Sequence, residues 1–445
     1  MRVVCSHVAT LVFLALACAL TAQPERDPED ALAQARDKVL DRTGHLPNYT
    51  CIQRVDRTYL KPAKPSVPVP SCDLLSAQRT KNANAMMVEA TDRLRLDVKV
   101  SAGNEIFSWA GDSHFSDGDI GGLAKGPFGT GPFGTFLSDI FTIPNVSFRF
   151  LGEEPARRKA QFLKYSFQVP RESSHYMVQA GGGWRVAGYE GEIQIDPNSF
   201  ELRRLVVRTS ELPEEADACE ATTAVEYATI RIGTGDFLLP RQSTLHFLMR
   251  DATESEISAT YSGCRQFVGE AKLVLQAGET ARKRPPARGA PISIPAGLPI
   301  MLALEEPIDS DTAAAGDTVA AQVTSAVREN ASRTVIIPAG SKVQCRVVRM
   351  EHWLDSPRYF LVALQLETIE VNGIVSPFYA ILRRGEAEKT LQTETSGLIG
   401  RGRPILLRPR GQSQLIATFT FTTAATHYVM RRGYEMKWTT VLAPG

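Results

Sequence analysis

The chain has 445 residues and a formal net charge of +1, from 50 basic and 49 acidic residues. A hydrophobic content of 43% is enough for folded cores and excludes a disordered coat protein. The balanced charge excludes a global field that would favour nucleic acid or an anionic membrane. The length suits two domains better than one.

A secretory signal peptide is predicted at the N-terminus. Arg2 supplies a short positive region, and an apolar run over residues 8–20 is too short to span a bilayer comfortably. Lipidation of Cys18 is an alternative, although Ala15 stands where a large aliphatic residue is usual. We expect residues 1–22 to be removed and the protein to be exported, to the periplasm or to the outer membrane.

Residues 23–277 are predicted to form an α+β domain with a mostly antiparallel sheet. Apolar spacing over residues 28–46 predicts an amphipathic helix. Turn residues at 196–198 and 233–235 predict two hairpins. The clearest strand has alternating polarity, and its apolar face consists of Leu94, Leu96, Val98 and Val100.

A second, all-β domain is predicted over residues 292–445. It follows a charged, proline-rich stretch at 278–291, which reads as an interdomain linker. Ile-Pro-Ala-Gly occurs twice, at 294–297 and 337–340, each time before an alternating strand, and Asn372-Gly373 is a strong hairpin signal. A small barrel or sandwich fits this pattern.

The first domain resembles the outer-membrane lipoprotein carrier and sorting fold. The residues that carry this resemblance are "LPNYTCIQRVDR", "YEGEIQIDPNSFELRRL" and "VEYATIRIGTGDFLLPRQSTLHF", and it covers roughly residues 27–275. The resemblance implies an open antiparallel half-barrel with helices, which binds an acyl chain or a protein partner on its concave side. It implies no catalytic residue.

The second domain resembles the periplasmic β-barrel of the TrbI-type component of conjugation and type IV secretion channels. The matching residues are "IPAGLPIMLALEEPIDSDTAAAGDTVAAQV" and "VIIPAGSKVQCRV", and the resemblance covers roughly residues 292–442. The chain departs from that pattern, because it shows no cytoplasmic segment with a membrane anchor and no long amphipathic antenna. The resemblance implies a barrel used for assembly or tethering. A structural secretion-channel component that forms rings is an alternative.

The repeat "KGPFGTGPFGTF" at residues 125–136 is not expected to bind nucleotide. A phosphate-binding loop needs Lys where Pro132 stands, and Pro127 and Pro132 each lack a backbone donor. Two interpretations remain for the phenylalanines in and after this repeat. In the first, they form a lip that grips an acyl chain or peptide. In the second, they fold back on the core. The residues are Phe128, Phe133, Phe136 and Phe141.

Five cysteines remain after the predicted cleavage, and none form a zinc or CxxC pattern. In an oxidising compartment we expect sequence neighbours to pair, as Cys51–Cys72 and Cys219–Cys264, each contributing about 3 kcal/mol through loop closure. Cys345 lies in an alternating strand and is expected to be a buried free thiol rather than a reactive one.

No enzymatic site is predicted. The chain has no G-x-S-x-G motif and its histidines are scattered, so a hydrolase would need residues that only the fold assembles. No metal or cofactor is expected either. Polar residues that can ligate a metal gather near residue 115 without the calcium-loop pattern, and we interpret them as a solvated turn: Asp112, His114, Asp117 and Asp119.

A local basic patch completes the candidate sites. It could touch lipid headgroups, peptidoglycan or another acidic envelope surface, or be a solvated loop, and it consists of Arg401, Arg403, Arg408 and Arg410. The sequence thus predicts a non-enzymatic, exported, mainly β protein of a bacterial envelope. Its expected partner is a lipid or an envelope protein, and not nucleic acid.

Overall fold

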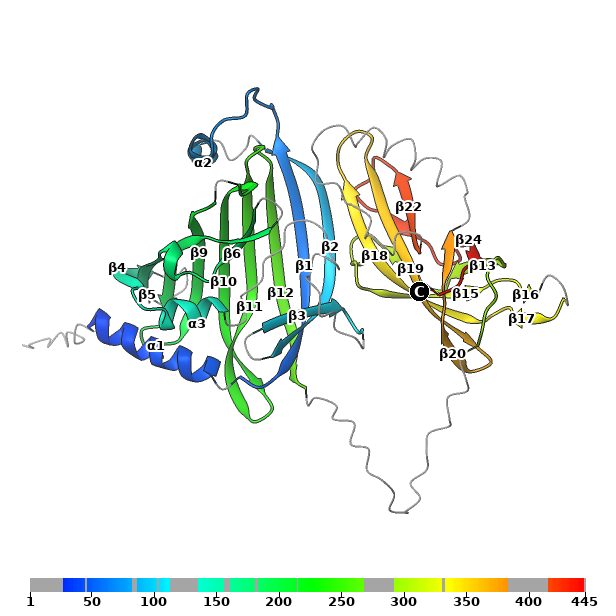
Figure 1. Ribbon diagram of the computed structural model, residues 1–445, viewed down its shortest axis with the longest axis horizontal. Coiled ribbons are helices and arrows are strands. Elements are labelled where there is room, and N and C mark those ends of the chain that lie inside the picture. The colour runs from blue at the N-terminus through cyan, green and yellow to red at the C-terminus, as the bar shows by residue number, and fades with distance from the viewer. Residues whose placement is uncertain are drawn as a thin grey trace, which may run out of the picture.

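The protein is described by a computed structural model, which shows two β-rich units side by side (Figure 1). It describes residues 27–44, 46–81, 86–101, 104–112, 135–155, 161–180, 183–213, 215–267, 292–329, 333–382 and 415–443. The predicted leader with Cys18, the linker at 278–291 and the basic patch at 401–410 lie outside these residues. No helix in the described residues is long and apolar enough to cross a bilayer.

The first unit is one antiparallel sheet, which agrees with the predicted mainly β fold. Its strands follow one another in the order β3 (Asn104–Trp109), β2 (Met86–Ser101), β1 (Tyr49–Pro62), β12 (Glu254–Gln266), β11 (Gly235–Met249), β10 (Ala218–Ile232), β9 (Leu202–Glu211), β8 (Gly188–Ile195), β5 (Gln161–Val169) and β4 (Ser147–Pro155). The turn between β8 and β9 forms as predicted, because Asp196 Oδ1 accepts the amides of Asn198 and Ser199.

Two helices cover one face of this sheet and a third lies against the other face. The predicted first helix is α1 (Pro28–Gly44), whose first turn is capped by Asp27 Oδ1 accepting the amide of Glu29. It shares an apolar cluster with α3 (Thr135–Thr142) and the inward residues of β5 to β11. Helix α2 (Cys72–Lys81) belongs to the opposite face. A short helical turn at Arg171–Ser173 and the hairpin β6 (Met177–Ala180) and β7 (Gly183–Val186) complete the unit.

The second unit is all β, as predicted. Its strands are β13 (Pro299–Leu304), β14 (Ile308–Asp309), β15 (Thr318–Val323), β16 (Val327–Arg328), β17 (Val335–Ile337), β18 (Lys342–Trp353), β19 (Tyr359–Val371), β20 (Ile374–Pro377), β21 (Ala380–Leu382), β22 (Ile416–Thr422), β23 (Val429–Met430) and β24 (Glu435–Thr440). Asn372 and Gly373 adopt positive φ at the predicted hairpin between β19 and β20. Cys345 is fully buried, and burial raises the pKa of its thiol to about 12, so it is inert.

The two units are joined by strand pairing that the sequence did not predict. The end of β18 pairs antiparallel with the start of β2, and Glu351 lies opposite Asp92. A loop of the second unit extends this contact, since the amide of Arg95 donates to the carbonyl of Ala315 at 2.7 Å. β2 is therefore paired on both sides and does not present a free edge there.

The four disulfide-forming cysteines form other pairs than the sequence predicted. The bonds are Cys51–Cys264 and Cys72–Cys219, so the predicted pairing of sequence neighbours is wrong. The reason lies in β1, which carries the chain roughly 35 Å away from Cys51 before α2 begins. Cys51 instead meets the neighbouring strand β12, and Cys72 meets β10.

Candidate functional site

The helix-covered face of the first sheet is apolar and closely packed. Phe136 and Phe141 of α3 are nearly fully buried, together with Leu137 and Ile140, in the stripe expected of an amphipathic helix. Phe141 stacks on Phe148 at a centroid distance of 5.7 Å. The two predicted lip residues that the structure describes thus lie folded onto the core. Phe128 and Phe133 lie outside the described residues, and ligand contact by the four stays a prediction.

The same face continues as a second apolar cluster over β1, β2 and β12. Its side chains are almost fully buried and include Val55, Leu96 and Val98, and Ala315 of the second unit joins them. The alternation predicted for β2 places these residues on one face, as its strand pairing shows.

A row of polar groups lies within this apolar face. Gln53 on β1, Ser243 on β11 and Tyr261 on β12 are all buried. Gln53 Nε2 donates to the Tyr261 hydroxyl at 3.3 Å, and that hydroxyl lies 2.9 Å from Ser243 Oγ. Gln53 Oε1 is buried with no hydrogen-bond partner in the described part of the chain. An unsatisfied buried acceptor costs about 1–3 kcal/mol, so this atom is suited to a donor from outside the chain.

Buried tyrosines surround this polar row. Burial and the neighbouring Tyr261 raise the pKa of Tyr227 well above its usual range, and burial does the same for Tyr261. Both phenols are therefore neutral at physiological pH. Sequence reasoning missed the row, although period two in "CIQRV" already places Gln53 on the same side as Cys51 and Val55.

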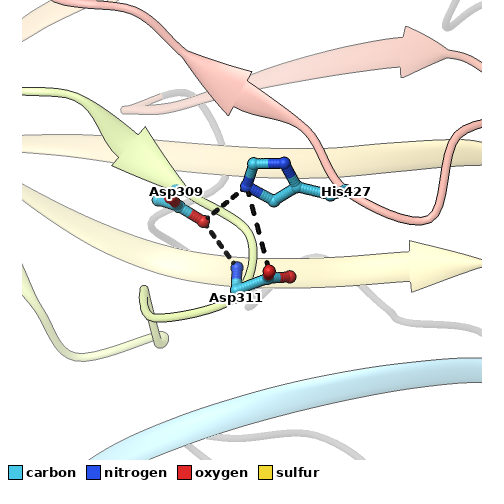
Figure 2. Close-up of side chains that lie close together, drawn as sticks. All are labelled: Asp309, Asp311 and His427. Carbon is cyan, nitrogen blue, oxygen red and sulfur yellow. Dashed lines mark hydrogen bonds and ion pairs between the residues drawn. The ribbon is translucent and has the colours of Figure 1, made fainter.

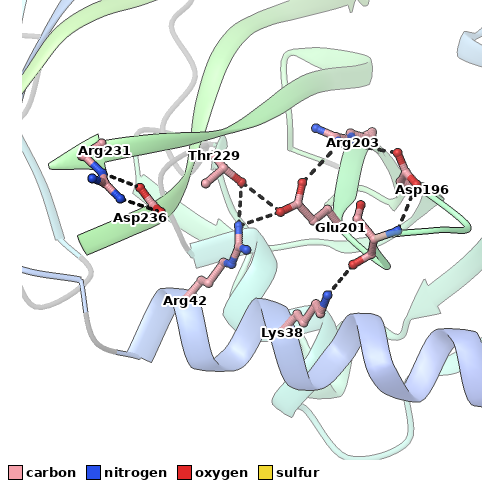
Figure 3. Close-up of polar contacts among 9 residues, drawn as sticks. Lys38, Arg42, Asp196, Glu201, Arg203, Thr229, Arg231 and Asp236 are labelled. Carbon is pink, nitrogen blue, oxygen red and sulfur yellow. Dashed lines mark hydrogen bonds and ion pairs between the residues drawn. The ribbon is translucent and has the colours of Figure 1, made fainter. Parts of the chain in front are cut away.

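Polar contacts hold the C-terminal end of helix α1 over the face (Figure 3). Arg42 donates to Thr229 Oγ1 at 2.6 Å and pairs with Glu201 at 2.9 Å, while Lys38 Nζ donates to the Ser199 carbonyl at 2.5 Å. The apolar contacts of α1 come from Ala31, Ala35 and Val39, which are buried, and from Leu32 and Leu40, which are partly buried against the same cluster. Movement of α1 away from the sheet would therefore expose two large side chains of its own, Leu32 and Leu40.

The opposite face carries an open groove of about 2010 Å³ beneath α2 and the loop before it, lined by both charged and apolar side chains. On its floor His246 Nε2 bonds to Glu254 Oε2 at 2.6 Å, and Arg79 of α2 lies 3.6 Å from the same carboxylate. Nε2 of the imidazole is thus bonded to a carboxylate, and its Nδ1 is buried without a partner among the described residues. Among the described residues, His246 bonds to a carboxylate and to no hydroxyl or thiol that it could activate.

A surface cluster in the second unit brings together Asp309, Asp311 and His427 (Figure 2). Their ligand atoms lie within 4.8 Å of one another, a grouping that a divalent cation could use. The same atoms stabilise the turn after β14, because Asp309 Oδ1 accepts the Asp311 amide at 2.8 Å and contacts His427 Nε2 at 2.9 Å. These contacts lower the pKa of Asp309. Of the calcium-like residues considered above, only Asp112 is described, in the turn after β3.

No protein-family model and no curated protein matches the chain. Solved structures match it in part. A LolA superfamily protein from Nitrosomonas europaea has 9% identity and a TM-score of 0.25, over 53% of this chain and 94% of its own. A putative outer membrane lipoprotein-sorting protein domain from Vibrio parahaemolyticus has 10% identity and a TM-score of 0.25, over 55% and 96%. ComB10 of the Com type IV secretion system of Helicobacter pylori has 18% identity and a TM-score of 0.19, over 33% and 86%.

These solved structures include lipoprotein-sorting proteins and a type IV secretion component, the two kinds of protein that the sequence resembles. At these identities and scores they transfer no activity to this chain.

Proposed function

We propose that this protein is a non-enzymatic component of a bacterial cell envelope that binds an amphiphilic lipid on the helix-covered face of its first sheet. The second unit serves as an assembly or tethering module. The observation that carries the proposal is the polar row of Gln53, Ser243 and Tyr261 within an otherwise apolar face. Sites for small amphiphiles combine a largely apolar lining with a few convergent polar groups in this way.

The polar row would hold the head of the ligand and the apolar clusters its chain. Gln53 Oε1 supplies an acceptor for a hydroxyl or amide of the head. Acyl carbons would lie along the side chains now covered by α1 and α3, after α1 has moved away from the sheet. The two disulfides fit an oxidising, exported compartment.

Native mass spectrometry tests this proposal on residues 23–445 purified from an envelope fraction. We expect a bound mass of lipid size, and we expect Gln53→Leu or Ser243→Ala to reduce the bound fraction about three- to tenfold, the value of one lost hydrogen bond. Thr244→Ala is the matched control, because Thr244 neighbours Ser243 but lines the groove on the opposite face.

Two results would contradict the proposal. One is a wild-type protein that carries no lipid after incubation with an envelope lipid extract. The other is equal lipid retention by Ser243→Ala, Gln53→Leu and the control, with circular dichroism showing that all are folded.

A further inference from the structure

Exposed apolar side chains are concentrated at one end of the first sheet. We call residues 60–81 and 86–88 the tip: the end of β1, the loop after it, α2 and the start of β2. Val67 is 95% exposed and Leu74 is 56% exposed. Three more large apolar side chains of the tip are exposed, and they are Val69, Met87 and Val88. Apolar groups gathered in this way on a surface indicate an interaction site.

The tip projects past the ends of the strands and is fixed in place (Figure 1). The disulfide Cys72–Cys219 ties the start of α2 to β10, and Leu75 is the buried anchor of this helix. Arg79 at its far end pairs with Glu220 and Glu254 on the sheet. The exposed apolar residues are thus presented on a preorganised support, which lowers the entropy cost of binding.

The backbone of the tip is suited to an apolar medium. Residues 63–70 form an irregular loop that contains Pro65, Pro68 and Pro70. An irregular segment that enters a lipid interface leaves backbone N–H groups without water, at a cost for each group. Proline has no N–H group, so this composition reduces that cost. A strand-pairing protein partner would instead need those donors.

The charge of the tip complements an anionic surface. Residues 60–81 contain one acidic residue, Asp73, and four basic residues, which are Lys61, Lys64, Arg79 and Lys81. Lys64 is exposed within the apolar loop, and Lys61 at its base pairs with Asp355. Basic side chains beside an inserted apolar segment are attracted to anionic headgroups.

We propose that the tip docks on an anionic phospholipid bilayer, with Val67, Val69 and Leu74 inserted among the headgroups. This docking site shares no residues with the proposed lipid-binding face or with the basic residues at 401–410. It does not depend on the proposed function, because it needs no lipid within the sheet.

Vesicle co-sedimentation of residues 23–445 tests the docking site. The probe is a vesicle of phosphatidylethanolamine and phosphatidylglycerol, compared with one of phosphatidylcholine alone. We expect binding to the anionic vesicle, and we expect the double variant V67D/V69D to bind it about tenfold more weakly or worse. V375D is the matched control, since Val375 on β20 is 61% exposed in the second unit and far from the tip in the chain.

A second measurement reports insertion directly. We expect tryptophan in the variant V67W to be quenched by brominated phosphatidylglycerol, beyond the quenching of the native tryptophans in the wild type. Equal vesicle binding by V67D/V69D and V375D would overturn the proposal. A wild-type protein that binds neither vesicle would also overturn it. If the tip in that case captures an envelope protein, the surface would be assigned to a protein partner instead.

Discussion

Arg57 forms a bidentate pair with Asp92 at the junction of the two units. Its Nε and Nη2 donate to Asp92 Oδ1 and Oδ2 at 2.7 and 2.6 Å, and the two side chains are 3% and 6% exposed. Asp92 lies opposite Glu351 across the β2–β18 pairing, so two buried carboxylates face each other. Arg57 and Arg349, which pairs with Glu351 at 2.6 Å, compensate this like-charge contact.

Removal of the Arg57 guanidinium should therefore be costly. We expect Arg57→Leu to lower the free energy of unfolding by about 3–5 kcal/mol, because it leaves a buried carboxylate without its partner. Urea unfolding followed by circular dichroism measures this loss. Arg54→Leu is the control on the same strand, where the Arg54–Asp56 pair is nearly half exposed and should contribute less than about 1 kcal/mol. Equal losses for both variants would contradict a buried charge network at the junction.

Acidification should weaken the same junction through His352. Its ring stacks on Phe360 at a centroid distance of 4.0 Å, and burial, followed by the positive charge of Arg358, lowers its pKa below the usual 6.5. The unfolded chain then binds the proton more readily than the folded one, so stability falls as the pH drops below about 6.5. His352→Phe keeps a stacked ring and should show a smaller loss between about pH 8 and pH 5.5 in urea unfolding. An unchanged pH dependence would show that His352 does not contribute.

The fold could be predicted from the sequence where local pattern decides it. Period two in "DRLRLDVKV" and the turn residues at Asp196 and Asn372 give strands and hairpins without knowledge of their neighbours. The disulfide pairing and the β2–β18 contact could not be predicted, because both depend on which strands become neighbours. The polar row was missed for a similar reason: Gln53, Ser243 and Tyr261 are distant in the sequence and meet only across three strands.

The two disulfides should contribute differently to the fold. They close loops with sequence separations of 213 and 147 residues, for which loop closure gives about 5 kcal/mol each. We expect Cys51→Ser with Cys264→Ser to lower the melting temperature of the whole first unit, since the pair lies within its core strands. Cys72→Ser with Cys219→Ser should mainly release α2, seen as faster amide exchange over residues 72–79. Protection of α2 that persists in this variant would show that Leu75 and Arg79 alone hold the helix.

The contacts of Arg42 should control how readily α1 leaves the apolar face. Arg42→Ala removes the hydrogen bond to Thr229 and the ion pair with Glu201, which together should stabilise the closed position by about 1–2 kcal/mol. The open population of α1 should then rise about five- to thirtyfold, and amide exchange over residues 28–44 should accelerate by the same factor.

A control variant at a nearby surface ion pair separates this effect from the loss of any exposed ion pair. Arg231 pairs with Asp236 at 3.0 Å at the end of the β10–β11 hairpin, and Figure 3 draws no contact between Arg231 and Lys38 or Arg42 of α1. Arg231→Ala should leave exchange in α1 unchanged. If α1 covers the binding face, Arg42→Ala should also exchange bound lipid faster than Arg231→Ala does. Faster exchange of the helix amides with an unchanged lipid exchange rate would show that the ligand reaches the sheet by another route.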